Sequence, residues 1–235
     1  MGQVWTYKMT YKLSPSSLNL IKECPRCFWL AQNKVWKRPA GIFPSLPSGM
    51  DKILKVHFDN FMNKGKMPPE LCEKYKDECK NLSLYDDEDN LKIWRNNFKG
   101  ISYTDKKGNL LRGAIDNLLV KGKGNNKSFI VLDYKTRGYP LKEDTAAHYQ
   151  LQVDTYNYLF QLNGYKTESY AYLLFYIPKE VKKTGEIVFD TELVKMNSNP
   201  KNAEKIWKNA LKLLAGDCPK NHGDDDCKWC CKVEG

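Results

Sequence analysis

The sequence predicts a mixed α/β fold, in which a mixed β-sheet is flanked by helices. The 235 residues are 41% hydrophobic and 28% charged, a globular composition that is ample for a sizeable core. Helical and strand-like segments follow the order helix, strand, strand, helix, strand, strand, helix. The segment SYAYLLFYIP, residues 169–178, is so apolar that it should lie inside a sheet.

The N-terminal half is predicted to be mainly helical. A serine followed by Pro15 begins a helix over residues 14–33. A loop rich in proline and glycine follows at residues 37–49, and an amphipathic helix at residues 50–65 ends at a glycine. The polar residues 67–90 are expected to form an insertion or an edge element.

The C-terminal half is predicted to hold most of the sheet. Residues 91–105 are a strand or a connector. Residues 110–121 and 128–136 are strands, and the turn GKGNNK between them makes a β-hairpin. Residues 146–164 form a helix that ends at a glycine. The remaining elements are strands over residues 169–178 and 185–194 and a helix over residues 202–216.

Charge and hydropathy limit the partners and the compartment. The net charge of +10 favours a polyanionic partner, with nucleic acid first, and a merely lysine-rich protein is the alternative. No stretch has the roughly 18 to 20 apolar residues of a membrane span, and the N-terminus lacks the apolar core of a signal peptide. We therefore expect a cytoplasmic protein without a membrane partner, whose thiols stay reduced.

An acid and a lysine end the second hairpin strand, in VLDYKTRG, residues 131–138. Asp133 and Lys135 are two residues apart, so in a strand they point to the same face. Burying them together is costly unless something uses them. Asp116, in the first hairpin strand, can approach Asp133 across the ladder. The alternative is a surface Asp–Lys pair on a half-exposed hairpin.

Two neighbouring carboxylates repel each other unless a cation lies between them. Magnesium takes few carboxylates, keeps waters and accepts phosphate oxygens. A lysine beside such an ion could orient or deprotonate a metal-bound water, or stabilise the charge that develops on phosphorus. Asp116, Asp133 and Lys135 therefore make a minimal site for phosphodiester hydrolysis.

The ordered pattern GAID, hairpin, DYKT and a helix carrying QVDTY resembles the PD-(D/E)xK nuclease superfamily. It is most similar to the RecB-like branch, which includes CRISPR-associated RecB-type exonucleases. The resemblance covers roughly residues 113–156 and implies a restriction-endonuclease-like core. It implies Asp116 and Asp133 as ligands of Mg²⁺ or Mn²⁺ and Lys135 as the catalytic lysine. The second acid is Asp rather than Glu, which the family allows.

The resemblance adds residues around this set. Gln152 and Tyr156 match the family's Gln and Tyr, and at i, i+4 they share one helix face. From there they could reach the metal site or the DNA backbone, and ordinary helix packing is the alternative. The Tyr134 carbonyl faces the same pocket and is expected to be a third metal ligand. Arg137 is expected to contact phosphate, with a surface charge as the alternative.

Members of this branch also carry a histidine ligand on an upstream helix. His57 is the matching residue here, on the helix that follows Gly49. The spacing is longer than usual, because Ile53 occupies the usual histidine position. Asp51, on the same helix, is an alternative ligand.

Eight cysteines in a cytosolic chain indicate a metal centre rather than disulfides. CPRC and DCKWCC contribute two CxxC pairs near opposite ends of the chain, which suggests four thiolates on one metal. The centre would link the helix at residues 14–33 to the tail at residues 217–235, within a single nuclease domain over residues 1–235. The best set is Cys24, Cys27, Cys227 and Cys230, and another is Cys24, Cys218, Cys227 and Cys230.

The resemblance also bears on the identity of this metal. Several RecB-like nucleases hold a four-iron cluster with one upstream cysteine and three C-terminal ones, which implies a [4Fe–4S] cluster. The two-plus-two spacing departs from that count, and it suits Zn²⁺ equally.

These observations predict a metal-dependent deoxyribonuclease of recombination, repair or defence, acting on DNA, with single strands among its substrates. The rival class is a non-catalytic nucleic-acid-binding adaptor that retains the nuclease fold. No position of the acid–acid–lysine set is degraded, which argues against the adaptor. A redox sensor built on the cysteines would leave the hairpin carboxylates unexplained.

Overall fold

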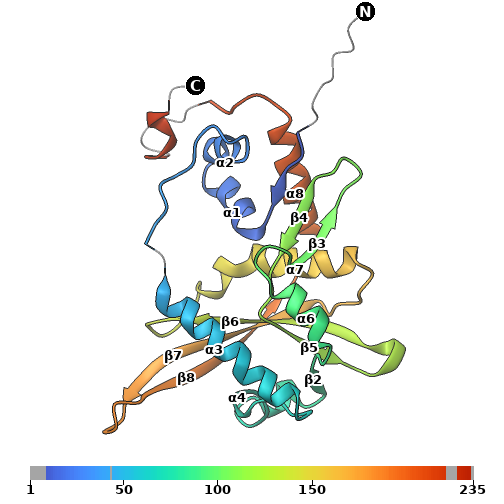
Figure 1. Ribbon diagram of the computed structural model, residues 1–235, viewed down its shortest axis with the longest axis vertical. Coiled ribbons are helices and arrows are strands. Elements are labelled where there is room, and N and C mark those ends of the chain that lie inside the picture. The colour runs from blue at the N-terminus through green and yellow to red at the C-terminus, as the bar shows by residue number, and fades with distance from the viewer. Residues whose placement is uncertain (1–8, 43, 221–226, 234–235) are drawn as a thin grey trace, which may run out of the picture.

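The structure, a computed structural model, describes residues 9–42, 44–220 and 227–233 (Figure 1). Two mixed β-sheets flanked by helices confirm the predicted fold class. Residues 221–226 and 234–235 of the predicted tail lie outside the described residues. The helices are α1 (Pro15–Glu23), α2 (Pro25–Gln32), α3 (Ser45–Met62), α4 (Pro69–Cys72), α5 (Lys76–Cys79), α6 (Glu88–Trp94), α7 (Gln150–Leu162) and α8 (Pro200–Leu214). The strands are β1 (Lys12–Leu13), β2 (Leu82–Leu84), β3 (Ile101–Thr104), β4 (Leu110–Gly113), β5 (Asn117–Lys121), β6 (Ser128–Thr136), β7 (Tyr170–Val181) and β8 (Ile187–Asn197).

The larger sheet has five strands in the order β2-β5-β6-β7-β8. Only the β6–β7 pair is parallel among these neighbours, because α7 makes the crossover between the two strands. The apolar β7 lies between β6 and β8, which confirms its predicted place inside the sheet. A smaller sheet has the order β1-β4-β3.

Helices cover both faces of the larger sheet. In Figure 1, α7 lies above the sheet, and α3 with α4 lies below it. The Phe58 ring of α3 packs 4.6 Å from the Tyr134 ring of β6, and the Phe160 ring of α7 packs 6.1 Å from the Phe129 ring. Beyond α7 lie α1, α2, α8 and the C-terminal segment, so the two ends of the chain meet on one side.

The N-terminal helical segment is broken in two at Cys24. The sequence predicts one helix over residues 14–33, whereas Cys24 is extended at φ −161° and ψ 108°. A residue before proline is disfavoured in the α region, and Pro25 follows here. Pro25 then begins α2, where its missing N–H removes no helical hydrogen bond. The break lets the Cys24 thiol accept a hydrogen bond from the Cys27 N–H.

The predicted strand over residues 110–121 is also two strands, and this expectation was wrong. Residues 110–113 pair with β1 and β3 in the small sheet, whereas residues 117–121 pair with β2 and β6. The chain leaves one sheet and enters the other at residues 114–116. Asp116 therefore lies in a bend between strands rather than within a ladder.

One further element differs from its expected boundary. Helix α3 begins at Ser45, inside the predicted loop, because Pro47 lies in the first turn, where a missing N–H costs nothing. The polar segment contributes β2, which is an edge strand as expected. None of the described helices is long and apolar enough to cross a membrane.

Candidate active site and cysteine centre

The bend between β4 and β5 holds Asp116 beside the end of β6. The Ile115 N–H donates to the Trp94 carbonyl at 3.1 Å, and Arg95 Nε donates to the Asp116 carbonyl at 2.7 Å. The Asp116 carboxylate in turn accepts the Tyr134 N–H at 2.8 Å through Oδ2. These bonds fix both the backbone and the side chain of Asp116.

Strand β6 brings Asp133 and Lys135 to the same face, as the alternation of a strand requires. The Asp133 side chain is only 3% exposed and that of Lys135 18%, and the Lys135 ammonium pairs with Asp133 Oδ2. Tyr134 points the other way, and its hydroxyl accepts a hydrogen bond from Asn117 Nδ2 at 2.7 Å. The surface alternative for this acid and lysine is therefore wrong, because both side chains are largely buried.

Helix α7 adds Gln152 and Tyr156 to this cluster. Gln152 Nε2 lies 3.2 Å from Asp133 Oδ1 and 2.7 Å from the Tyr156 hydroxyl, and Gln152 Oε1 accepts from Lys135 Nζ at 3.3 Å. The Tyr156 hydroxyl donates to the Ala114 carbonyl at 2.5 Å. One network thus joins α7, the end of β6 and the bend that carries Asp116.

The Tyr156 ring packs so closely on the backbone of Gly113, in the GAID motif, that no side chain fits there. A Cβ added there would lie 2.5 Å from Tyr156 Cε1, so only glycine allows the tyrosine ring this close to the backbone. The close approach is what brings the Tyr156 hydroxyl to the Ala114 carbonyl.

Helix α3 contributes a residue that the sequence reasoning missed. Lys55 Nζ lies 3.1 Å from Asp116 Oδ1 and 2.7 Å from Asp51 Oδ1. Asp51 and Lys55 are one helical turn apart, which is the only signal that the sequence carried. Asp51 was the alternative to His57 as a ligand, and it reaches the cluster through this lysine.

The two aspartates are held in a setting that disfavours two negative charges. Burial, and next the charge of Asp133, raise the pKa of Asp116 to about 7. Burial also raises the pKa of Asp133, against the attraction of Lys135. Asp133 Oδ2 is buried and pairs with the Lys135 ammonium. A divalent cation bound by the two carboxylates would relieve their repulsion, so these residues fit one.

Asp116→Asn is expected to raise the melting temperature of the metal-free protein by roughly 5 °C at pH 8, and by little at pH 4. The folded-state pKa of Asp116, about 7, lies above its ordinary value of 3.8, so its ionisation destabilises the fold. This destabilisation is small below pH 3.8 and grows until the pH passes about 7. Asparagine removes the charge and still accepts the Tyr134 N–H. Thermal unfolding in EDTA across this pH range measures the effect.

A matched control is Asp190→Asn on β8. A hydrogen bond from Lys74 lowers the pKa of Asp190, so removing its charge should not stabilise the protein at pH 8. If Asp116→Asn lowers the melting temperature equally at pH 4 and pH 8, the carboxyl is not under the electrostatic strain described.

The other predicted site residues have different surroundings. His57 Nε2 lies 2.8 Å from Glu70 Oε1 of α4, and its ring packs edge-on against Phe61 at 5.1 Å. These contacts are not with either aspartate, so His57 as a metal ligand stays a prediction. Arg137 follows β6 directly and is half-buried, with Nε donating to the Tyr139 carbonyl at 3.1 Å.

Four buried cysteines meet where the two ends of the chain come together. The Sγ atoms of Cys24, Cys27, Cys227 and Cys230 all lie within 4.8 Å of one another. The Cys24–Cys230 and Cys27–Cys227 separations are both 3.5 Å. This set of four thiols can hold a metal. Cys24 is the N-cap of α2 and Cys27 lies within α2, whereas Cys227 and Cys230 belong to the C-terminal segment. Cys218, of the other set, instead accepts a hydrogen bond from Arg26 at 3.4 Å.

The surroundings favour the ionised form of Cys227, whereas burial raises the pKa values of Cys27 and Cys230. Arg38 Nη2 lies 3.7 Å from Cys227 Sγ. Burial acts to raise the pKa of Cys227, but N–H groups of Cys230 and Trp229 outweigh it and bring the pKa to about 6. Arg26, 6% exposed, donates to the carbonyls of Pro219 at 2.8 Å and Val233 at 3.0 Å. The tail is thus hydrogen-bonded to α2 as well as joined through the thiols.

The sulfur separations bear on which metal fits. One tetrahedral ion with metal–sulfur bonds of about 2.3 Å holds its sulfurs roughly 3.8 Å apart. The observed range, from 3.5 Å up to 4.8 Å, fits such an ion directly. A four-iron cluster binds each thiolate to a different iron, so the side chains would need to move apart to accept it.

On this mixed α/β fold, two aspartates, a lysine at the end of a central strand and a glutamine on the following helix form one cluster of polar contacts. A sequence profile of the PD-(D/E)XK nuclease superfamily matches residues 85–232, which is more than half of the chain. The chain therefore belongs to the PD-(D/E)XK nuclease superfamily, whose members are generally nucleases that use divalent metals.

Other comparisons are more distant. Among solved structures, the crystal structure of SSO0001 matches with a TM-score of 0.41 and 16% identity, over 95% of this chain and 84% of that chain. No curated protein matches the chain significantly.

Proposed function

We propose that this protein is a divalent-metal-dependent deoxyribonuclease of the RecB-like branch. The observation that carries the proposal is the single, largely buried cluster of Asp116, Asp133, Lys135 and Gln152, in which each member contacts another member or the backbone beside it. Asp116 and Asp133 would hold Mg²⁺ or Mn²⁺. When bound, that ion supplies a Lewis acid for a scissile phosphate oxygen.

The lysine and the helix residues have separate roles in this proposal. Lys135 provides a fixed positive charge for the phosphate as its negative charge grows. Gln152 fixes the side chains of Lys135 and Asp133 relative to each other, because its amide oxygen contacts the lysine and its amide nitrogen contacts the aspartate. Tyr156 is a positioning residue, because its hydroxyl links Gln152 to the Ala114 carbonyl, two residues before Asp116.

Two further ligands and a phosphate contact belong to the same proposal. The Tyr134 N–H points at Asp116, and the N–H and C=O of one strand residue point to the same side. This supports the Tyr134 carbonyl as a third metal ligand. His57 would join through Nδ1, because its Nε2 pairs with Glu70. Arg137 follows the strand that carries Lys135, which suits it to a neighbouring phosphate.

The cysteine centre completes the proposed architecture of one nuclease domain over residues 1–235. It would link α1 and α2 to the C-terminal tail, and α1 packs against α7, which carries Gln152. The RecB-like resemblance supports a [4Fe–4S] cluster, and the short sulfur separations support Zn²⁺. In either case the centre holds the N-terminal helices next to the acidic site.

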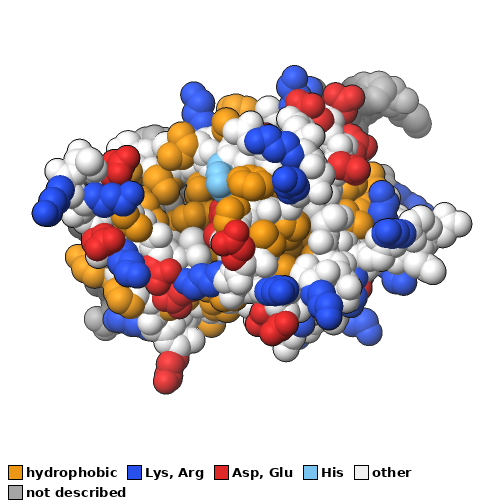
Figure 2. All heavy atoms as spheres, turned by 90° about the horizontal axis from the view of Figure 1, so that it is seen from below, with side chains coloured by type: hydrophobic (Ala, Val, Ile, Leu, Met, Phe, Trp, Pro, Cys, Tyr) orange, Lys and Arg blue, Asp and Glu red, His pale blue; other side chains and the backbone are white. Residues whose placement is uncertain are grey.

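Charge supports DNA as the polyanionic substrate. The chain carries a net charge of +10, so electrostatic attraction to phosphates is expected. The face below the sheet in Figure 2 mixes positive and negative side chains around exposed hydrophobic ones, and offers no continuous positive field. We therefore propose that DNA approaches from the α1 and α7 side.

Labelled single-stranded and double-stranded oligonucleotides should be cleaved with Mg²⁺ or Mn²⁺ and not in EDTA. Returning Mg²⁺ alone should restore cleavage, because the carboxylates bind hard, oxygen-seeking ions. Denaturing gels measure the products. Cleavage that persists in EDTA would contradict metal dependence. Tight DNA binding without cleavage in any of these metals would favour the non-catalytic adaptor.

A further inference from the structure

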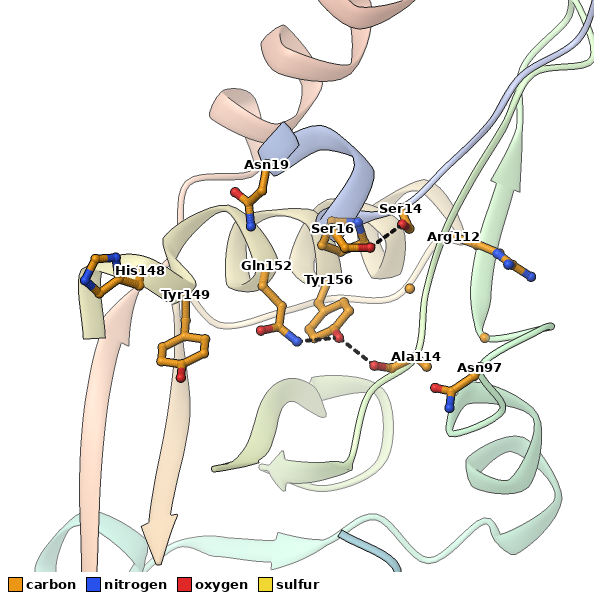
Figure 3. A pocket seen from close by; sticks show the side chains of 13 residues that line it. Ser14, Ser16, Asn19, Asn97, Arg112, Ala114, His148, Tyr149, Gln152 and Tyr156 are labelled. Atoms are coloured by element: carbon orange, nitrogen blue, oxygen red, sulfur yellow. Dashed lines mark hydrogen bonds between the residues drawn. The ribbon is translucent and has the colours of Figure 1, made fainter. Parts of the chain in front are cut away.

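A cavity adjoins the candidate active site, and neither Asp116 nor Asp133 is among the described residues that line it. It has a volume of about 460 Å³ and lies between α1, α7, β4 and the loop that follows α6 (Figure 3). Gln152 and Tyr156, which also belong to the acidic cluster, form part of its wall. The cavity therefore shares a wall with the acidic cluster.

The lining of this cavity is polar and suits a nucleotide. It includes the hydroxyls of Ser14 and Ser16, the side-chain amides of Asn19 and Asn97, and the Arg112 guanidinium. No carboxylate is among the described residues that line it, in contrast to the acidic site next door. An anion is therefore not repelled here, and amides and hydroxyls can bond base edges or sugars.

Two of these polar groups are available to a ligand. The side-chain amides of Asn19 and Asn97 form no hydrogen bond with any described residue. Figure 3 shows Asn19 reaching from α1 towards Gln152, with Asn97 on the far side of Ala114. The Tyr149 ring also lines the cavity, and Lys135 Nζ lies 4.6 Å from its centroid, which offers an aromatic face beside the catalytic lysine.

We propose that this cavity binds the unpaired nucleotide that flanks the scissile phosphate of a single DNA strand. The proposal rests on the proposed nuclease function and names its substrate class. The cavity has the volume for about one nucleotide, within the usual size of ligand pockets. The cavity has walls from α1, α7, β4 and the loop after α6, so a nucleotide inside it has no room for a paired partner, and the flanking base must be unpaired.

Bulky substitutions in opposite walls test the cavity directly. Asn19→Trp fills it from α1 and Asn97→Trp from the opposite loop, so the pair guards against failure of one variant to fold. The control is Asn60→Trp, the same change at an exposed helical asparagine outside the cavity. Thermal unfolding identifies any variant that is not folded.

Binding of a labelled single-stranded oligonucleotide is measured by fluorescence anisotropy, with Ca²⁺ in place of Mg²⁺. Both cavity variants should bind the single strand about tenfold more weakly than Asn60→Trp, and a blunt duplex should show a smaller loss. The proposal is overturned if either folded cavity variant binds the single strand as tightly as the control. Equal losses on single strand and duplex would overturn it as well.

A second substrate separates this proposal from the proposed function. Bis(p-nitrophenyl) phosphate has a scissile diester but no flanking nucleotide. With Mn²⁺, the cavity variants should lose much more kcat/KM for the oligonucleotide than for bis(p-nitrophenyl) phosphate. A wild-type protein that hydrolyses neither substrate would overturn the nuclease proposal, and the binding measurement would still decide the cavity.

Discussion

Lys135→Ala is expected to lower the rate of DNA cleavage by about 10³-fold, and Asp133→Ala by at least as much. The Lys135 side chain is 18% exposed, and its ammonium is held by Asp133 and Gln152. Burial acts to lower the pKa of Lys135, but the charge and hydrogen bond of Asp133, together with the charge of Asp116, raise the pKa above its ordinary value. Lys135 is therefore charged at neutral pH, and its expected contribution is electrostatic.

Lys135→Arg distinguishes a charge from a proton carrier. An arginine keeps the positive charge and should recover part of the lost activity, whereas a general base would not be rescued. Lys179→Ala, at an exposed lysine on β7, is the matched control and should keep wild-type activity. Single-turnover cleavage with Mg²⁺ measures all four variants. Unchanged activity in Asp133→Ala and Lys135→Ala would contradict the assignment of Asp133 and Lys135 as active-site residues.

Cys24→Ala and Cys230→Ala are each expected to abolish stoichiometric metal and to lower the melting temperature by more than about 10 °C. Both thiols are buried, and they belong to segments more than 200 residues apart in the sequence. Without the metal, the tail is held to α2 mainly by the bonds of Arg26. Elemental analysis and thermal unfolding of the purified variants measure the two effects.

Two other cysteines complete this experiment. Cys72→Ala, at an exposed thiol in α4, is the control and should keep both metal and stability. Cys218→Ala separates the two ligand sets, because it removes metal only if Cys218 is a ligand. The ratio of iron to zinc in the wild type, together with visible absorption, decides between a four-iron cluster and one zinc ion. Full metal content in Cys24→Ala would contradict a centre built on the two CxxC pairs.

The polar ends of β6 and α7 could be predicted because their geometry is local. Strand alternation puts Asp133 and Lys135 on one face, and helical spacing puts Gln152 and Tyr156 on another. The structure confirms both placements and joins them into one network. The two CxxC pairs were recognisable in the same way, since each is a short local motif.

The surroundings of Asp116 and the role of Lys55 could not be predicted. A strand-like pattern continues through residues 110–121, and nothing in it indicates that the two halves join different sheets. Lys55 looks like any charged residue of an amphipathic helix until α3 packs against β6. The cavity beside Gln152 likewise has walls from four separate segments, so no single stretch of sequence contains it.

The sequence by itself determined the fold class, the acid–lysine pair of β6 and the two cysteine pairs. Each depends on periodicity or spacing within a few residues, and such patterns are imposed by backbone geometry alone. Only the tertiary structure decided where the strand breaks at Asp116, that Lys55 faces Asp116, and that the four thiols lie within 4.8 Å. These features depend on contacts between distant segments, which form only when the whole core packs.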